Sequence, residues 1–301
     1  MMEINAKLVK ELRDKTGAGM MDCKRALIEN EGDLEKAAEC LRKKGLMDAA
    51  KKSSRTAADG LIVLSLTPDH KTGSIIELNS ETDFVAKNEK FQALASKIAD
   101  VALEINNTEE IAKSMKNEID SLISLVGENM TLRRSEKISV DNGVISAYVH
   151  NAVSENMGKI GVLVALESSS KDIEKLRDFG KKIAMHIAAA NPSYLCSKCI
   201  PQSVIDKERS IILDQAKEIG KPSDIAEKMA DGRIKKFYEE IVLLEQPFVM
   251  DNKTKVKDVV ENFGKEIGSD VKLVSFVKYI LGEGIERATS NFAEEVMSFV
   301  K

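Results

Sequence analysis

Residues 59–85 read DGLIVLSLTPDHKTGSIIELNSETDFV, and this stretch decides the class of fold. The side chains of 61–66 alternate as those of a strand do, and 74–78 form a second such run after the turn-forming residues of 67–73. Two short strands joined in this way predict an antiparallel hairpin. A helical pattern begins near Asn88, so the stretch predicts a hairpin followed by a helix.

A second copy of this unit occurs later in the chain. The sequence NGVI at 142–145 resembles DGLI at 59–62, and GVLVAL at 161–166 resembles GSIIEL at 73–78. A helical pattern follows each copy. We therefore predict an α+β fold with a duplicated core of antiparallel sheet and helix.

The two copies differ where the strand meets the helix. The first carries ETDFV at 81–85 and the second carries SSSKD at 168–172. One interpretation is that Thr82 or Asp83 caps the next helix while Phe84 packs beneath it. The other is a rigid wedge, in which the apolar ring of Phe84 inserts into a partner and the carboxylate of Asp83 disturbs a cation site there. Because such connections often carry function, we keep both interpretations open.

Residues 1–55 have the pattern of a separate module of three short helices. Apolar residues recur at helical spacing in three stripes, which are broken at 16–19 and again at 31–33. We expect the third helix to close at Gly45 and residues 51–55 to form a polar linker. A bundle this small has a marginal core of its own.

The pattern also predicts the remaining boundaries. Residues 56–140 form the first core subdomain and 141–281 the second. The second contains an inserted αα-hairpin at 202–238, expected to be a coiled coil. Residues 282–301 form a C-terminal helical module, with a last helix at about 291–300.

Composition favours a protein partner. The net charge is −4, aromatic residues make up 4% of the chain and Trp is absent, whereas nucleic-acid binding requires a basic excess and stacking rings. Apolar runs such as 160–166 are too short to span a bilayer, and charge interrupts the N-terminus where a signal peptide would be apolar. We expect a cytoplasmic protein with no direct contact to nucleic acid or membrane.

The cysteines and histidines give little support for catalysis. Cys196 and Cys199 form a C-x-x-C pair, but Cys23 and Cys40 lie far away in sequence and do not complete a four-ligand zinc site. Four cysteines in 301 residues are not a disulfide framework. No P-loop, G-x-S-x-G or H-E-x-x-H motif is present. We expect no cofactor, no metal, no redox role and no covalent catalysis.

His186 lies among small and apolar residues in the segment 183–189. It suits a core-edge histidine with one hydrogen bond, or a polar group offered to a partner from a helix face. The residues alone favour the former.

Seven segments together resemble bacterial elongation factor Ts, the nucleotide-exchange factor of elongation factor Tu. They are TGAGMMDCK at 16–24, TDFVAK at 82–87, IAMH at 183–186, EKM at 227–229, GR at 232–233, QPFVM at 246–250 and GEGIE at 282–286. Their common order covers essentially the whole chain. The resemblance implies a ubiquitin-associated-like first module, the duplicated core and the coiled-coil hairpin.

The resemblance also implies roles for individual residues. Asp83 and Phe84 would enter the G domain of elongation factor Tu near its Mg²⁺ site, displace the ion and release GDP so that GTP binds. The remaining residues support this loop or bind the partner: Thr82 and Val85 hold the loop in shape, Val126 and Gly127 lie beside it, Arg13, Met20 and Met21 touch a partner helix, and His186 meets another partner domain. Here the resemblance reverses the preference drawn from the residues around His186.

Two other classes of function stay open. The first module alone would suit a ubiquitin-associated-type adaptor, although this leaves most of the chain unexplained. The Cys196/Cys199 pair would suit an enzyme, which a zinc assay and a thiol titration would test. The hairpin at 202–238 would either dimerise or extend the partner surface, and its sequence does not decide between these.

Overall fold

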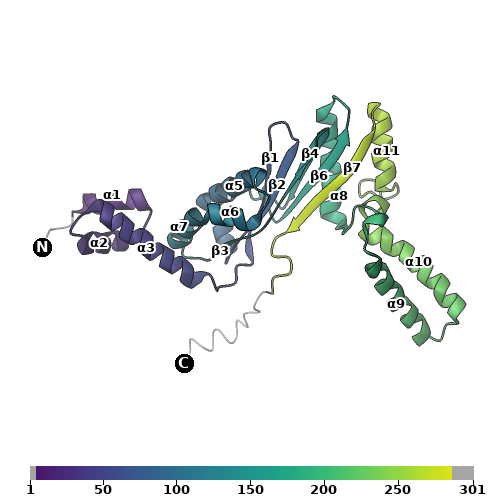
Figure 1. Cartoon of the computed structure of the whole chain (residues 1–301), viewed down its shortest axis with the longest axis horizontal. Coiled ribbons are helices and arrows are strands. Elements are labelled where there is room, and N and C mark those ends of the chain that lie inside the picture. The colour runs from purple at the N-terminus through teal and green to yellow at the C-terminus, as the bar shows by residue number, and fades with distance from the viewer. Residues whose placement is uncertain (1–4, 287–301) are drawn as a thin grey trace. The chain divides into compact units, whose positions relative to one another are not determined.

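The computed structural model describes residues 5–286 (Figure 1). The helix predicted at 291–300 lies outside the described residues. The chain forms two compact units, and each unit is built from separate stretches of the sequence. The first takes its described residues from 5–63, 76–135 and 280–286, and the second comprises 64–75 and 136–279.

The first unit begins with the predicted three-helix module. Its helices are α1 (Ala6–Thr16), α2 (Met20–Glu29) and α3 (Leu34–Lys52). Asn5 and Asp33 cap α1 and α3 by accepting backbone N–H groups with their side chains. The module has a core of its own, made of Val9, Leu12, Cys23, Ala26, Leu27 and Ala37.

Helix α3 is longer than expected. The prediction that it closes at Gly45 is wrong, because the helix continues to Lys52. Gly45 is buried within it, and a Cβ atom there would lie 2.9 Å from the Ser124 hydroxyl of α7 (Lys116–Val126). The glycine is thus a point of close contact between two helices rather than a helix stop.

A four-stranded sheet follows the module. Its order is β3-β2-β1-β5, from β1 (Asp59–Leu66), β2 (Thr72–Ser80), β3 (Met130–Ser139) and β5 (Met157–Gly158). Between β2 and β3 the chain forms four helices: α4 (Asp83–Ala86), α5 (Glu89–Glu104), α6 (Thr108–Ser114) and α7. Buried apolar side chains of β1, β2 and α5, including Ile62, Ile76, Phe91 and Ile98, make the core.

A buried ionic cluster joins β2 to β3. Glu77 is fully buried, and its carboxylate accepts hydrogen bonds from Arg133 at 3.1 Å, from Arg134 at 2.6 Å and from the backbone N–H of Gly282 at 2.8 Å. Burial raises the pKa of Glu77, but the Gly282 N–H, the Asn79 amide and the Arg134 guanidinium together hold that pKa below its usual value. The carboxylate therefore stays ionised inside the fold.

The second unit contains a three-stranded sheet of order β4-β6-β7. Its strands are β4 (Gly143–His150), β6 (Ile160–Ser168) and β7 (Val271–Ile280), and β4 pairs with β6 antiparallel. Helices α8 (Ile173–Ala190) and α11 (Val256–Ile267) contribute to one core with this sheet, where Phe179 stacks on Phe263 at 4.0 Å between ring centroids.

Two glycines support the predicted duplication. Gly60 opens the first hairpin with φ +125°, and Gly143 opens the second with φ +134°. A Cβ atom on Gly60 would collide with the carbonyl oxygen of Leu78, and one on Gly143 would collide with that of Leu166. Each copy thus requires glycine at the same place for the same reason.

The predicted αα-hairpin consists of α9 (Gln202–Glu218) and α10 (Ser223–Ile241) (Figure 1). Ile212 on α9 and Ala230 and Ile234 on α10 form its small apolar seam. Short 3₁₀ turns, η1 (Ser197–Cys199) and η2 (Leu243–Glu245), lie at its two ends. No helix within residues 5–286 is long and apolar enough to cross a membrane.

Candidate partner-binding site

The segment that follows β2 is a single turn of helix rather than an open loop. Thr82 has an extended backbone at the N-cap position of α4, and the Ser80 hydroxyl donates to the Thr82 carbonyl at 2.9 Å. Asn88 then caps α5 through its side chain. The segment is therefore short and bounded by hydrogen bonds on both sides.

The side chains of this turn divide between core and solvent. Val85 and Ala86 are buried, whereas Phe84 is 78% exposed. The interpretation in which Phe84 packs beneath the helix is wrong. Asp83 pairs with Lys87 at 2.9 Å, and the Lys87 ammonium lies 5.8 Å from the centroid of the Phe84 ring. Phe is among the residues enriched in protein–protein interfaces, so this exposed ring is a candidate contact for a protein partner.

Glu128 and Asn129 hold this segment from the other side. The Glu128 carboxylate accepts from the backbone N–H of Thr82 at 3.0 Å and from its hydroxyl at 2.8 Å. In the opposite direction, the Glu81 carboxylate accepts the backbone N–H of Asn129 at 2.6 Å. Three hydrogen bonds therefore join residues 81–82 to residues 128–129.

Val126 and Gly127 make this arrangement possible. Val126 is the last residue of α7, and Gly127 follows it in a left-handed conformation with φ +88°. That conformation is natural for glycine after a helix, and it ends α7 immediately before Glu128. Val126 and Gly127 thus lead directly into Glu128, which contacts the segment.

The same network reaches the linker after α3. The Asn129 side-chain amide donates to the carbonyl of Arg55 at 2.7 Å, and the Arg55 guanidinium lies 3.5 Å from the Glu81 carboxylate. Residues of the linker and of the α4 segment therefore hydrogen-bond to the same residue, Asn129. Sequence reasoning missed Glu128 and Asn129; the available signal was a pair of polar residues directly after a glycine helix stop.

A second exposed group lies in the helical module. Met20 and Met21 occupy the first turn of α2, where they are 59% and 69% exposed. Arg13 in the last turn of α1 is also exposed. Unbranched, polarisable methionine side chains adapt to the shape of a partner. This surface is therefore suited to binding, separately from α4.

His186 is fully buried in α8, whereas a residue that meets a partner directly would be exposed. Its Nε2 donates to the Gln246 side-chain oxygen at 2.9 Å, and its Nδ1 accepts the backbone N–H of Val249 at 3.2 Å. Burial lowers the pKa of His186, although the bond to Gln246 opposes this shift. The neutral ring fixes the 246–250 segment, whose Met250 is 50% exposed.

Cys196 and Cys199 form a disulfide. This bond was not predicted from the sequence; a single disulfide between cysteines three residues apart is still not a disulfide framework. The two cysteines bracket η1, directly before α9.

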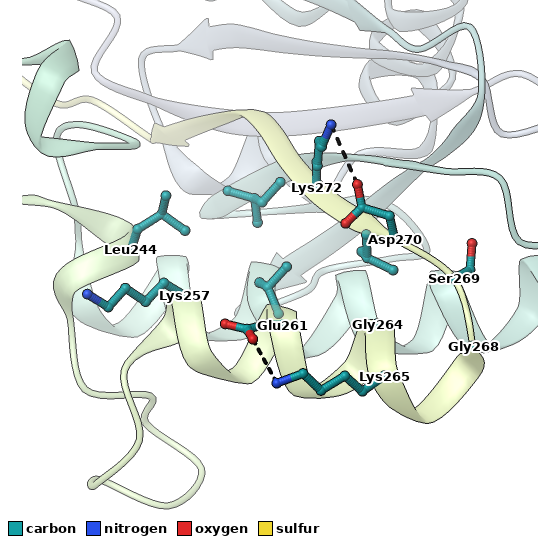
Figure 2. A pocket seen from close by; sticks show the side chains of 12 residues that line it. Leu244, Lys257, Glu261, Gly264, Lys265, Gly268, Ser269, Asp270 and Lys272 are labelled. Carbon is teal, nitrogen blue, oxygen red and sulfur yellow. Dashed lines mark ion pairs between the residues drawn. The ribbon is translucent and has the colours of Figure 1, made fainter.

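A groove in the second unit lies along α11 and β7 (Figure 2). Four of its charged groups pair with one another: Lys265 with Glu261 at 2.7 Å, and Lys272 with Asp270 at 3.5 Å. Both pairs are well exposed to solvent. The groove therefore has the character of a solvated surface, and we place the candidate site at α4 and α2.

Comparison with known proteins shows which family this chain resembles. Residues 81–283 match the family model described as elongation factor TS. The chain is 51% identical to the elongation factor Ts of Rhodospirillum centenum, with 99% of each chain covered. It is 48% identical to that of Rickettsia bellii, with 100% of this chain and 99% of the relative covered. The similarity extends over the full length rather than over one segment.

Proposed function

This chain belongs to the elongation factor Ts family, and from that premise we propose that it promotes the exchange of GDP for GTP on elongation factor Tu. The observation that carries the proposal is Phe84, a largely exposed phenyl ring on a helical turn that Glu128 holds in place. A ring held this way binds a partner with little loss of backbone freedom, since the segment is ordered before the encounter.

We assign different tasks to the residues of α4. Phe84 enters the G domain of elongation factor Tu and shifts the packing around the bound Mg²⁺. Asp83 brings a carboxylate close to that ion. Because Mg²⁺ supplies much of the positive charge that holds the nucleotide phosphates, loosening its contacts releases GDP. Thr82 and Val85 keep the segment in shape, the former through Glu128 and the latter through burial.

Binding of this factor and binding of nucleotide oppose each other. Suppose that this protein binds nucleotide-free elongation factor Tu more tightly than the GDP form. Linkage then requires that this protein and GDP each weaken the other's binding to elongation factor Tu by the same ratio. After GDP has left, GTP present in excess binds elongation factor Tu and displaces the exchange factor. No covalent bond is made or broken in this cycle.

The other surfaces serve affinity. Met20, Met21 and Arg13 anchor the factor to a helix of the partner, through contacts that persist while nucleotide exchanges. His186 acts on another partner domain indirectly, because the buried ring positions the segment that carries Met250. The hairpin of α9 and α10 extends the partner surface or dimerises.

The test is nucleotide release from purified elongation factor Tu loaded with fluorescent GDP. Adding this protein in catalytic amounts should accelerate release, and immobilised protein should retain elongation factor Tu until GDP elutes it. Release at the intrinsic rate, or retention that GDP does not reverse, would contradict the proposal. The ubiquitin-associated-type adaptor predicts retention without acceleration.

A further inference from the structure

The Cys196–Cys199 disulfide lies where the chain enters α9. Cys196 is partly buried and Cys199 is exposed to solvent, so the pair borders solvent on the Cys199 side. The intervening residues form η1, and Pro201 immediately precedes α9. The exchange mechanism proposed above does not use this pair.

The two legs of the hairpin are held differently. At the end of α10, Val242 and Leu243 are fully buried. The Leu243 N–H also donates to the Tyr194 carbonyl at 2.8 Å, and the Tyr194 N–H donates to the Ile241 carbonyl at 3.0 Å. These contacts fix the α10 leg to the body of the unit.

The α9 leg starts from the turn that the disulfide closes. Apart from the disulfide, that turn has one backbone hydrogen bond at 2.9 Å, from Cys199 to Cys196, and a weak one at 3.5 Å, from Ile200 to Ser197. Ile200 is buried and provides one apolar contact. Opening the disulfide thus removes the covalent constraint on the start of α9.

A metal site explains the Cys196 and Cys199 pair less well than thiol–disulfide chemistry does. Within residues 5–286, no group of three or more His, Cys, Asp or Glu side chains is arranged to hold a metal ion. A structural zinc site requires four ligands. Two sulfurs spaced three residues apart, already joined and bordering solvent, are instead typical of thiol–disulfide chemistry.

We propose that Cys196 and Cys199 are a redox-active pair that exchanges with low-molecular-weight thiols and disulfides, and that its state sets how firmly α9 is held. In reduction, a thiolate attacks the Cys199 sulfur, the bond to Cys196 breaks, and the Cys196 sulfur leaves as a thiolate that takes up a proton. A second glutathione thiolate then attacks the glutathione sulfur of the mixed disulfide, and the Cys199 sulfur leaves as a thiolate that takes up a proton. One protein disulfide and two glutathione molecules give one protein dithiol and one glutathione disulfide, and oxidation is the reverse.

The first test counts thiols in the full-length chain, which has four cysteines. The protein is equilibrated in glutathione buffers from reducing to oxidising, quenched with acid, denatured and alkylated, and its mass is measured. We expect four alkylated cysteines in reducing buffer and two in oxidising buffer, with a reversible transition. Four at every ratio, or two even in excess reduced glutathione, would overturn the proposal.

Two variants localise the effect. Cys40→Ser, which removes a partly buried thiol of the helical module, should lower both counts by one and leave the transition unchanged. In Cys196→Ser, Cys199 can only take up one glutathione, which the mass reveals, so the paired loss of two alkylatable thiols without added mass should be abolished. A paired loss that survives in Cys196→Ser would assign the chemistry to other cysteines and overturn the proposal.

The second test concerns α9 and uses hydrogen exchange of the same protein. Amides of 199–206 should exchange severalfold faster in the reduced form, and amides of α10 should change little. The double variant Cys196→Ser/Cys199→Ser should exchange at the fast rate in both buffers. Equal rates in the oxidised and reduced wild-type protein would show that the pair does not control α9. Neither test depends on the exchange activity, so this inference and the proposed function fail separately.

Discussion

Glu128 binds Thr82 twice, because its two carboxylate oxygens accept the backbone N–H at 3.0 Å and the hydroxyl at 2.8 Å. The two residues are 46 positions apart in sequence. Hydrogen bonds to an ionised group contribute about 1.5–3 kcal/mol each to stability. Thr82 is the N-cap of α4, so Glu128 fixes the helix that carries Phe84.

We expect Glu128→Gln to slow maximal GDP release by about tenfold, which corresponds to roughly 1.4 kcal/mol of lost transition-state stabilisation. The amide keeps the shape of the side chain but accepts through only one oxygen, so α4 loses its fixed position. The affinity for nucleotide-free elongation factor Tu should change much less. Stopped-flow release measured over a range of factor concentrations separates the two quantities.

Glu118→Gln is the matched control. Glu118 lies in the first turn of α7, and its carboxylate pairs with Lys97 at 2.8 Å on an exposed surface. Exposed pairs contribute about 0–1 kcal/mol. Maximal release should be unchanged in this variant. Equal rates for Glu128→Gln and wild type would mean that the segment does not need Glu128.

Phe84→Ala should reduce maximal GDP release by more than about tenfold, because the ring that enters the partner is gone. Phe84→Leu keeps apolar bulk and should retain part of the activity. Since the ring is exposed, neither change should alter the free energy of unfolding by more than about 0.5 kcal/mol. Wild-type release by Asp83→Ala/Phe84→Ala would rule out the wedge.

The sequence was sufficient to predict the fold class because the decisive constraints are local. Gly60 and Gly143 stand at the same place in two similar hairpins, and their clashing Cβ positions show why both are glycine. The alternation of apolar residues predicted the strands, and helical stripes predicted the hairpin of α9 and α10. The prediction of a helix end at Gly45 was wrong because glycine is required there by a close contact with Ser124, which is distant in sequence.

The candidate site was only partly predictable, for the same reason. Phe84 lies on a turn whose N-cap residue, Thr82, is held by Glu128, a pairing that no spacing rule indicates. The burial of His186 likewise depends on Gln246, 60 residues later. Long-range hydrogen bonds between side chains leave no periodic signal, so the structure was needed to find them.

Met20→Ala should raise the dissociation constant for elongation factor Tu by about fivefold, the effect of truncating an interface residue worth roughly 1 kcal/mol. Maximal GDP release should stay near wild type, since α4 is untouched. Met47→Ala is a good control, because Met47 is 63% exposed on α3 of the same module. The anchoring role fails if Met20→Ala and Met47→Ala have the same affinity, which titration calorimetry would measure.

Glu77→Gln should lower the free energy of unfolding by about 3–5 kcal/mol, because it removes one partner of a buried ionic cluster. Arg133 and Arg134 would then lack the carboxylate that accepts from both. Urea denaturation followed by circular dichroism measures the change. The control is Glu136→Gln, at an exposed position of β3, which should change the free energy by less than about 0.5 kcal/mol. Equal stability of the two variants would mean that the cluster is not stabilising.

His186 should make the protein less stable as the pH falls below about 6.5, the ordinary pKa of histidine. Its pKa is lowered in the folded state, mainly by burial, so between the folded and unfolded pKa values the unfolded chain binds more protons. Stability is therefore complete above the unfolded pKa and is lost as the pH falls through the folded one. Protonation would also place a proton on Nδ1, against the Val249 N–H that this atom accepts.

The measurement is the urea midpoint between pH 8 and pH 5, in wild type and in His186→Asn, whose side-chain oxygen can replace Nδ1 as acceptor. We expect the variant to be less stable at pH 8 by about 1–3 kcal/mol, because the Gln246 oxygen loses its donor. Its loss of stability toward pH 5 should be smaller than that of wild type. Burial also lowers the pKa of His70, so some pH dependence should persist in the variant. Parallel curves for the two proteins would show that His186 does not titrate in this range, and the neutral ring would then have to be explained without proton linkage.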